Sequence, residues 1–253
     1  MKVVVIGGSG LVGSNVVRRL AARGHDPLPA SPATGVDTIT GEGLARVMAG
    51  ADVVVDVSNA PAWEDDAVRE FFTTSTRNQL AAERHAGVGH HVAVSIVGAD
   101  RLPDSGYLRA KVAQETEIEA GGVAYTILRS TQFFEFLART VEAGAEGDTV
   151  RLSPGLMQLV AADEVAAMVT ELATGAPANG RVELGGPEAL GIDDWARRLF
   201  TATGDEREVV TDPHARYFGT ELKGSELTTG DGARIATTDF DSWFTTHPQA
   251  VAR

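Results

Sequence analysis

Apolar residues in this chain form short continuous runs, separated by longer stretches in which apolar residues recur at helical spacing. One run occupies residues 2–6, and similar runs occupy residues 51–57 and 91–97. Continuous apolar runs rich in β-branched residues are typical of strands buried on both faces. The helically spaced stretches predict helices packed on such strands. The alternation therefore indicates an α/β fold, a doubly wound parallel sheet with right-handed crossovers.

This alternation is regular up to residue 130 and looser beyond it. Pro27 and Pro29 weaken the second predicted strand, because proline cannot donate to a sheet ladder. We read residues 1–155 as the core domain, and residues 156–253 as further sheet and helix elements plus a small C-terminal lobe in the same compact unit. The predicted strands are 2–6, 27–31, 51–57, 91–97, 124–128, one near 159, 181–184 and 208–210; the predicted helices are 12–23, 44–48, 65–86, 107–120, 133–141, 163–173, 193–201 and 239–244.

Three glycines follow the first strand at a spacing with a known physical use. Gly7, Gly10 and Gly13 would allow a sharp turn, close approach of the backbone to a pyrophosphate, and tight contact between helix and sheet. The N-terminus of the following helix offers unpaired N–H groups to phosphate oxygens. The alternative is an ordinary strand–helix turn without a ligand. Because the triplet joins a strand to a helix, it predicts a dinucleotide site, formed by Gly7, Ser9, Gly10, Leu11, Val12 and Gly13.

Composition narrows the classes of function. The formal net charge of −13 opposes phosphate backbones and no basic stripe counters it, so nucleic-acid binding is not expected. The chain has no cysteine, which excludes disulfides and thiolate zinc sites. No apolar run reaches membrane-spanning length, and the histidines lack metal-ligand spacing. We expect a cytoplasmic protein that acts on a small molecule without a bound metal; the sequence leaves the oligomeric state open.

A single Tyr-x-x-x-Lys pair, Tyr107 and Lys111, lies on the helix expected at 107–120. The chain has three tyrosines and three lysines, so a chance pair at this spacing is roughly a one-in-thirty event. Residues i and i+4 of a helix share a face, so both side chains would project into one pocket. A neighbouring ammonium would lower the pKa of Tyr107 from about 10 and fit it for proton transfer. Ser95, near the end of the fourth strand, could hydrogen-bond a substrate oxygen.

Each of these residues also has a purely structural interpretation. Tyr107 could be a helix-capping aromatic that packs on a cofactor without transferring a proton. Ser95 could satisfy the backbone of a loop, as serines at strand ends commonly do. Lys111 could be a solvated helix lysine, although this chain seldom uses lysine.

The glycine-rich opening, the Ser95…Tyr107…Lys111 spacing and the segment Tyr-Thr-Ile-Leu-Arg-Ser-Thr-Gln-Phe-Phe at 125–134 resemble the short-chain dehydrogenase/reductase superfamily, and within it the atypical NmrA-like branch. The resemblance covers about the first 175 residues. It implies an NAD(P)-binding Rossmann fold in which Ser95, Tyr107 and Lys111 form the catalytic set, with Lys111 also holding the nicotinamide ribose. NmrA-like members often lose the tyrosine, and some bind dinucleotide only as redox sensors. The presence of Tyr107 favours an enzyme.

Residues after the second strand indicate which dinucleotide is bound. NAD enzymes usually place a carboxylate there and NADP enzymes an arginine, and this chain has neither. Ser31, with Thr34 nearby, could hydrogen-bond a 2′-phosphate, and the first carboxylate beyond it is Asp37. We therefore expect NADP, although Ser31 could simply begin the next turn.

Two further segments are expected to complete the site. Ser58 and Asn59 end the third strand, where the resemblance places loop backbone against the cofactor. The segment after the fifth strand would face the substrate and give the pocket an apolar wall, while core packing of one phenylalanine fits the pattern equally well. This segment consists of Thr131, Gln132, Phe133 and Phe134.

The leading hypothesis is an NAD(P)H-dependent reductase of a small carbonyl, enone or quinone. Hydride would come from the nicotinamide and the proton from Tyr107. The alternatives are a non-enzymatic NAD(P) redox sensor of the NmrA-like kind, and a sugar-nucleotide epimerase or dehydratase. The last is disfavoured because the C-terminal portion is small for a nucleotide-sugar lobe.

Overall fold

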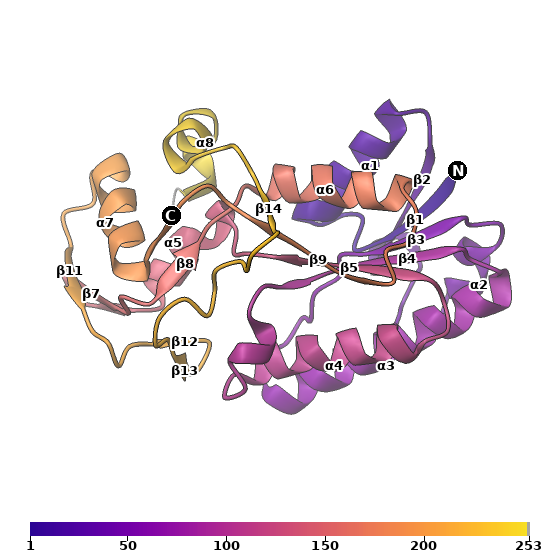
Figure 1. The fold of residues 1–253 in the computed structure, drawn as a ribbon, viewed down its shortest axis with the longest axis horizontal. Helices are drawn as coiled ribbons and strands as arrows, with labels where there is room; N and C mark the ends of the chain where they lie inside the picture. The colour runs from indigo at the N-terminus through magenta and orange to yellow at the C-terminus, as the bar shows by residue number, and fades with distance from the viewer. Residues whose placement is uncertain (252–253) are drawn as a thin grey trace. The chain divides into compact units, whose positions relative to one another are not determined.

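The computed structural model describes residues 1–251. Its first half follows the predicted alternation of strand and helix closely (Figure 1). The elements up to residue 130 are β1 (Lys2–Ile6), α1 (Leu11–Ala22), β2 (Asp26–Ala30), α2 (Leu44–Met48), β3 (Val53–Asp56), α3 (Asp65–Ala86), β4 (His90–Ile96), α4 (Gly106–Ala120) and β5 (Tyr125–Ser130), with short 3₁₀ turns at Pro32–Thr34 and Ala99–Arg101.

Within the described residues, seven strands form one sheet in the order β14-β9-β5-β4-β3-β1-β2. The pairs β1–β2, β1–β3 and β3–β4 are parallel, as expected for strands joined by helical crossovers. After β1 the chain moves to β2 on one side, and after β2 it returns to β3 on the other side of β1. This reversal creates a switch point between the carboxyl ends of β1 and β3, the place where open α/β sheets bind ligands. The doubly wound parallel sheet is confirmed.

The second strand forms in spite of its two prolines because it lies at the edge of the sheet. The N–H of Asp26 donates to Met1 O, and Ala30 O accepts from Gly7 N, both at 2.9 Å. The residues that bond to β1 are thus the even-numbered ones. Pro27 and Pro29 lack an N–H on the opposite, unpaired side, where no ladder bond is lost.

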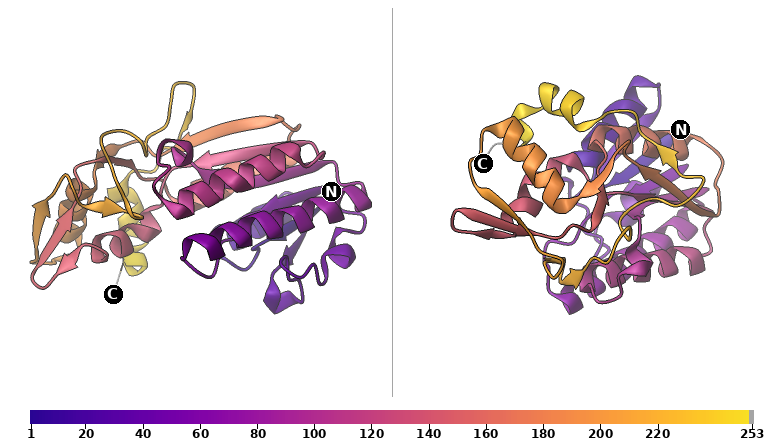
Figure 2. Two further views of the ribbon diagram at one scale, coloured as in Figure 1. Left: turned by 90° about the horizontal axis from the view of Figure 1, so that it is seen from below. Right: turned by 60° about the vertical axis from the view of Figure 1, so that its left-hand side comes forward.

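Helices cover both faces of this sheet. Figure 1 shows α1 and α6 (Ala162–Thr174) on one face, and α3 and α4 side by side on the other, an arrangement that Figure 2 repeats from below. Helix α3 turns an unusually polar face inward, since Ser75, Thr76, Gln79 and Glu83 are all buried together with its apolar residues. Buried polar side chains require partners, and several of those partners belong to the site described below.

The chain divides into two compact units that interleave along the sequence. The first contains residues 1–96, 106–129 and 163–182, and the second contains residues 97–105, 130–162 and 183–253. We had expected a division at residue 155. The division differs because α6, which follows that boundary, returns to pack with the first unit, and residues 130–155 already belong to the second.

The second unit is built from short elements around an aromatic core. Phe134, Trp195, Phe240 and Trp243 are buried there, and the rings of Phe134 and Trp243 lie 5.3 Å apart. The remaining elements of the chain are α5 (Leu137–Glu142), β6 (Ala145–Glu146), β7 (Thr149–Leu152), β8 (Leu156–Gln158), β9 (Gly180–Gly185), β10 (Ala189–Gly191), α7 (Ile192–Thr203), β11 (Glu208–Thr211), β12 (Arg216–Tyr217), β13 (Thr220–Glu221), β14 (Arg234–Ile235) and α8 (Phe240–Thr246).

Candidate active site

The glycine turn between β1 and α1 has almost no room for side chains. A Cβ on Gly13 would lie 2.1 Å from the carbonyl oxygen of Gly7, and Gly7 itself has a φ of +77°. Gly10 is different, because its Cβ would meet only Gly7 O, at 3.3 Å, and its φ of −80° suits any residue. Gly13 is therefore required for packing, whereas Gly10 leaves an open backbone surface.

The N-terminus of α1 is free to receive an anion. Its N-cap, Gly10, makes no side-chain cap, and the first turn contains no acidic residue. Ser9 and Leu11 are exposed beside it, and Val12 is half-buried. The first-turn N–H groups of a helix without a side-chain cap bind phosphate oxygens readily. The residues present thus fit the pyrophosphate of a dinucleotide.

The loop after β2 brings Ser31 next to this turn. Gly7 N donates to Ala30 O, so Ser31 directly follows the residue that the glycine turn contacts. Ser31 is only 8% exposed, yet its Oγ has no hydrogen-bond partner among the described residues. Thr34 is already engaged, since its hydroxyl accepts from Ser31 N and donates to Ser31 O, both at 2.9 Å. Of the two hydroxyls considered for a 2′-phosphate, only that of Ser31 is unused.

The loop after β3 lies against the same turn. A Cβ on Gly7 would lie 2.9 Å from Val57 O and 3.0 Å from the backbone of Ser58. Ser58 is fixed by the buried carboxylate of Asp56, whose Oδ1 accepts from Ser58 N at 2.9 Å and from Ser58 Oγ at 2.6 Å. Asn59 is exposed. The structure therefore brings Ser58 and Asn59 to the switch point beside the glycine turn.

Tyr107 lies in the first turn of α4, half-buried among aromatic rings. Its hydroxyl donates to Asn59 Oδ1 at 2.8 Å. Its ring centre lies 6.0 Å from that of Phe72 and 5.5 Å from that of Trp63. Burial raises the pKa of Tyr107 to about 12. The lowered pKa that we expected is thus wrong for this structure, because desolvation of the phenol dominates.

Lys111 is buried one turn further along α4. Its Nζ donates to Val94 O at 2.9 Å and to Gln114 Oε1, and it lies 4.4 Å from the centre of the Phe72 ring. Burial lowers the pKa of Lys111 to about 8, against the opposing influence of the Asp56 and Glu115 carboxylates. Tyr107 and Lys111 thus meet the same ring on α3, as their spacing predicts. The solvated-lysine alternative does not fit a side chain that is only 4% exposed.

Ser95 is the next-to-last residue of β4 and is buried. Its Oγ has no hydrogen-bond partner in the described part of the chain. The structural alternative, a hydroxyl that satisfies loop backbone, therefore finds no support. A buried hydroxyl without a partner is costly, and a ligand oxygen would relieve that cost.

The segment after β5 belongs to the second unit and divides into two kinds of residue. Thr131 and Gln132 carry side-chain oxygens, Oγ1 and Oε1, that lack partners within residues 1–251. Phe133 is half-buried and stacks on Phe136 at 5.7 Å. Phe134 is fully buried in the aromatic core. The structure corrects the proposed pocket wall for Phe134, which packs as a core residue.

Three residues of the first unit were not singled out from the sequence. Asp56 and Gln114 connect Lys111 to the loop after β3, and Trp63 covers the Tyr107 ring while remaining 45% exposed. An aspartate that ends an otherwise apolar strand is a usable signal in the sequence. Gln114 and Trp63 carry no such signal, because a helix glutamine and a loop tryptophan are common.

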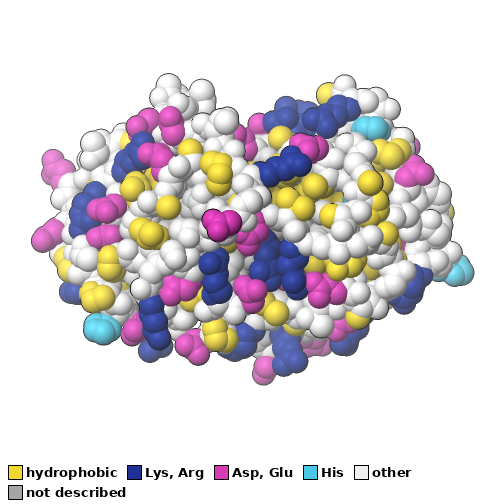
Figure 3. All heavy atoms as spheres, in the orientation of Figure 1, with side chains coloured by type: hydrophobic (Ala, Val, Ile, Leu, Met, Phe, Trp, Pro, Cys, Tyr) yellow, Lys and Arg dark blue, Asp and Glu magenta, His cyan; other side chains and the backbone are white. Residues whose placement is uncertain are grey.

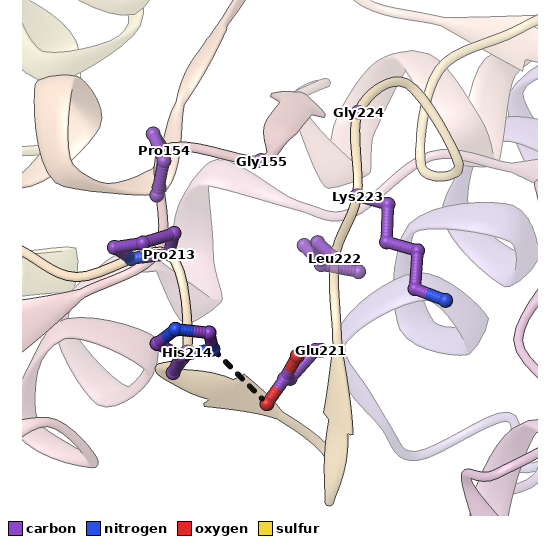
Figure 4. Close-up of a pocket in the computed structure, with 8 residues that line it drawn as sticks. All are labelled: Pro154, Gly155, Pro213, His214, Glu221, Leu222, Lys223 and Gly224. Atoms are coloured by element: carbon purple, nitrogen blue, oxygen red, sulfur yellow. Dashed lines mark ion pairs between the residues drawn. The ribbon is translucent and has the colours of Figure 1, made fainter.

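The second unit contains a separate surface pocket of about 350 Å³. Figure 4 shows its lining, in which His214 and Glu221 approach each other at 3.6 Å. None of the predicted site residues lines it.

Membrane-spanning helices and metal clusters are both absent from residues 1–251. No helix in this range is long and apolar enough to cross a membrane, and no cluster of His, Asp and Glu side chains in it could hold a metal ion. Basic and acidic side chains are interspersed over the face drawn in Figure 3.

Comparison with known proteins places the chain in a wider group. A family described as NAD(P)H-binding matches residues 7–175. The chloroplastic divinyl chlorophyllide a 8-vinyl-reductase of Oryza sativa subsp. indica is 28% identical, over 83% of this chain and 61% of the rice protein. The chain spans about half the length of the curated relatives that it matches.

Solved structures share the fold at low sequence identity. MoeE5, in complex with UDP-glucose and NAD, superposes with a TM-score of 0.78 at 14% identity, covering 99% of this chain and 98% of that one. The dTDP-4-dehydrorhamnose reductase from Bacillus anthracis, in complex with NADP, gives a TM-score of 0.71 at 15% identity, covering 88% of each chain. At such identities the likeness establishes the fold alone.

Proposed function

Because the chain belongs to the NAD(P)H-binding family, we propose that it is an oxidoreductase that reduces a small carbonyl, enone or quinone with NADPH. One observation carries this proposal: Tyr107 and Lys111 lie on one face of α4, and the Tyr107 hydroxyl reaches the loop that lies against the glycine turn. A phenol and an ammonium in this arrangement are suited to proton transfer beside a bound dinucleotide.

The residues that would hold the cofactor follow the carboxyl edge of the sheet. The pyrophosphate would lie on the turn from Gly7 to Gly13, at the free N-terminus of α1. Ser58 and Asn59 would contact the nicotinamide half. Lys111 has a third N–H beyond its two hydrogen bonds, and this donor would hold the ribose.

NADP is the proposed cofactor, and Ser31 supports this choice. Its unpartnered Oγ would donate to a 2′-phosphate oxygen, and no carboxylate lies between it and Asp37 to repel the phosphate. Reduced nicotinamide supplies a hydride to the substrate when bound.

The chain's own part in the chemistry is to manage one proton. At neutral pH Tyr107 holds its proton, because burial raises its pKa to about 12. In the productive complex the hydroxyl turns from Asn59 to the substrate oxygen and donates that proton as negative charge develops there. Ser95 Oγ donates a hydrogen bond to the same oxygen. The phenolate that remains is stabilised by the charge of Lys111 and regains its proton from solvent.

One observation favours a second candidate, an NAD(P) redox sensor without turnover. The Tyr107 hydroxyl is committed to Asn59 and its pKa is raised rather than lowered. A tyrosine that stayed in this position would pack against the cofactor and transfer no proton.

Cofactor titration and a substrate panel separate the two candidates. Purified protein is titrated with NADPH and with NADH by reduced-nicotinamide fluorescence, and the absorbance decay is then followed with ketones, enones and quinones. The reductase predicts tighter binding of NADPH and decay that depends on the substrate. Binding without decay on any of these compounds would favour the sensor, and absence of binding would contradict both.

A further inference from the structure

Lys111 is connected to a buried carboxylate through a single side chain. The Oε1 atom of Gln114 accepts from Lys111 Nζ, and its Nε2 donates to Asp56 Oδ2 at 3.1 Å. Exposed fractions are 4% for Lys111, 2% for Gln114 and 1% for Asp56. An amide that accepts at one end and donates at the other has its orientation fixed by both neighbours. Gln114 therefore aligns its dipole between an ammonium and a carboxylate.

Asp56 extends this connection to Tyr107. Its other oxygen, Oδ1, holds the backbone and hydroxyl of Ser58. Asn59, the next residue, accepts from the Tyr107 hydroxyl, and Tyr107 shares helix α4 with Lys111 and Gln114. The contacts thus close into a ring that contains both residues of the proposed proton-transfer pair.

The surroundings of Lys111 explain why this link matters. Phe72 of α3 faces its ammonium with an aromatic ring, and β4 offers one carbonyl, that of Val94. The carboxylates that act on it are Asp56 of β3 and Glu115 of α4. Glu115 is engaged elsewhere, in a bidentate pair with Arg129. Gln114 is thus the route by which hydrogen bonding connects Lys111 to a carboxylate.

We infer that Gln114 is a positioning residue, which couples Lys111 to Asp56 and so holds the lysine charged and aimed beside Tyr107. This inference rests on the proposed role of Lys111 in the reductase. A buried ammonium loses its charge easily, and an amide oxygen on Nζ, backed by a carboxylate, favours the charged form.

The chain offers a matched control in Gln79 of α3. Its Nε2 also donates to Asp56 Oδ2 at 3.1 Å, and its side chain is fully buried. It hydrogen-bonds Ser75 and has no bond to Lys111 within the described residues. Gln114→Leu and Gln79→Leu therefore remove equivalent bonds from one carboxylate oxygen, and only the first removes a partner of Lys111.

The titration of Lys111 is measured directly in the full chain. Because the protein has three lysines, ¹³C-lysine labelling gives a small set of side-chain signals, and the spectrum of Lys111→Arg assigns the one that matters. We expect Gln114→Leu to lower the titration midpoint of Lys111 by about one pH unit, and Gln79→Leu to leave it within about 0.3. Gln114→Glu, which keeps the acceptor and adds negative charge, should raise the midpoint.

Turnover then tests the consequence for catalysis. The alkaline limb of kcat/KM should move to lower pH in Gln114→Leu and stay in place in Gln79→Leu. Equal shifts of the lysine midpoint in both leucine variants, or no shift in either, would overturn the inference. If Gln114→Leu does not fold, a lowered or unchanged midpoint in Gln114→Glu would do the same. The lysine signal needs no substrate, so a protein without reductase activity still tests the role of Gln114, and the two failures are distinguishable.

Discussion

At the scale of single residues, Ser31 decides the proposed choice of cofactor. Replacing it with aspartate puts a carboxylate where the 2′-phosphate would lie, and two anions at hydrogen-bond distance repel each other. Ser31→Asp should weaken NADPH binding by about tenfold or more, which corresponds to about 1.4 kcal/mol, while NADH binding stays the same or improves. Fluorescence titration with both cofactors measures the ratio. A ratio equal to that of the unchanged protein would remove Ser31 from the cofactor site.

The sequence was sufficient for some residues of the site and insufficient for others. The spacing of Tyr107 and Lys111 correctly predicted a shared helix face, because helical periodicity is local. It could not predict the raised pKa of Tyr107, since desolvation depends on Phe72 and Trp63, which the fold brings from elsewhere. Gln114 and Asp56 are 58 positions apart, and only the packing of α4 near the end of β3 makes them neighbours.

At the scale of elements, the turn from β1 to α1 separates a packing glycine from a binding glycine. Gly13→Ala would place Cβ against the backbone of Gly7, and overpacking of this kind costs about 1–3 kcal/mol or more. Gly10→Ala needs a shift of only a few tenths of an ångström, but puts a methyl group on the phosphate surface. Thermal unfolding and NADPH titration should show Gly13→Ala strongly destabilised, and Gly10→Ala near normal in stability but at least tenfold weaker in binding. Normal NADPH affinity in Gly10→Ala would contradict the assigned surface.

Strands and helices of the first unit were predictable because each carries a long, regular apolar pattern. Strand β2 was the weakest such prediction, and it forms because its two prolines lie on the unpaired side of an edge strand. In the second unit β6, β12, β13 and β14 have two residues each. A pattern so short has no periodicity to detect, and such strands depend on contacts that only the folded chain provides.

At the scale of the whole molecule, two adjacent buried histidines give stability opposite dependences on pH. Burial, together with the neighbouring His91, lowers the pKa of His90 to about 4. The stability contributed by neutral His90 is therefore present above its unfolded pKa, about 6.5, and is lost as pH falls toward 4. Burial also acts to lower the pKa of His91, but pairing with Glu83 at 2.8 Å raises it overall. Its contribution is complete below pH 6.5 and is lost as pH rises through the raised value.

Comparison with a His90→Gln variant isolates the first effect. The Thr126 hydroxyl, which lies 2.9 Å from His90 Nε2, can donate to the glutamine oxygen instead, while the His91–Glu83 pair is common to both proteins. Between pH 7 and pH 5 the unchanged protein should lose about 1–2 kcal/mol more of its unfolding free energy than the variant. Urea unfolding at the two pH values measures this difference, and parallel losses would show that His90 does not titrate as described.

The most direct test of the reductase proposal is turnover by Tyr107→Phe, measured with NADPH and the best substrate of the panel. The variant keeps the aromatic packing on Phe72 and Trp63 and removes only the hydroxyl that donates the proton. We expect kcat to fall by about two orders of magnitude or more, with NADPH affinity within about threefold of normal. Unchanged turnover with unchanged affinity would show that the proton comes from another group, and would remove Tyr107 from the chemistry.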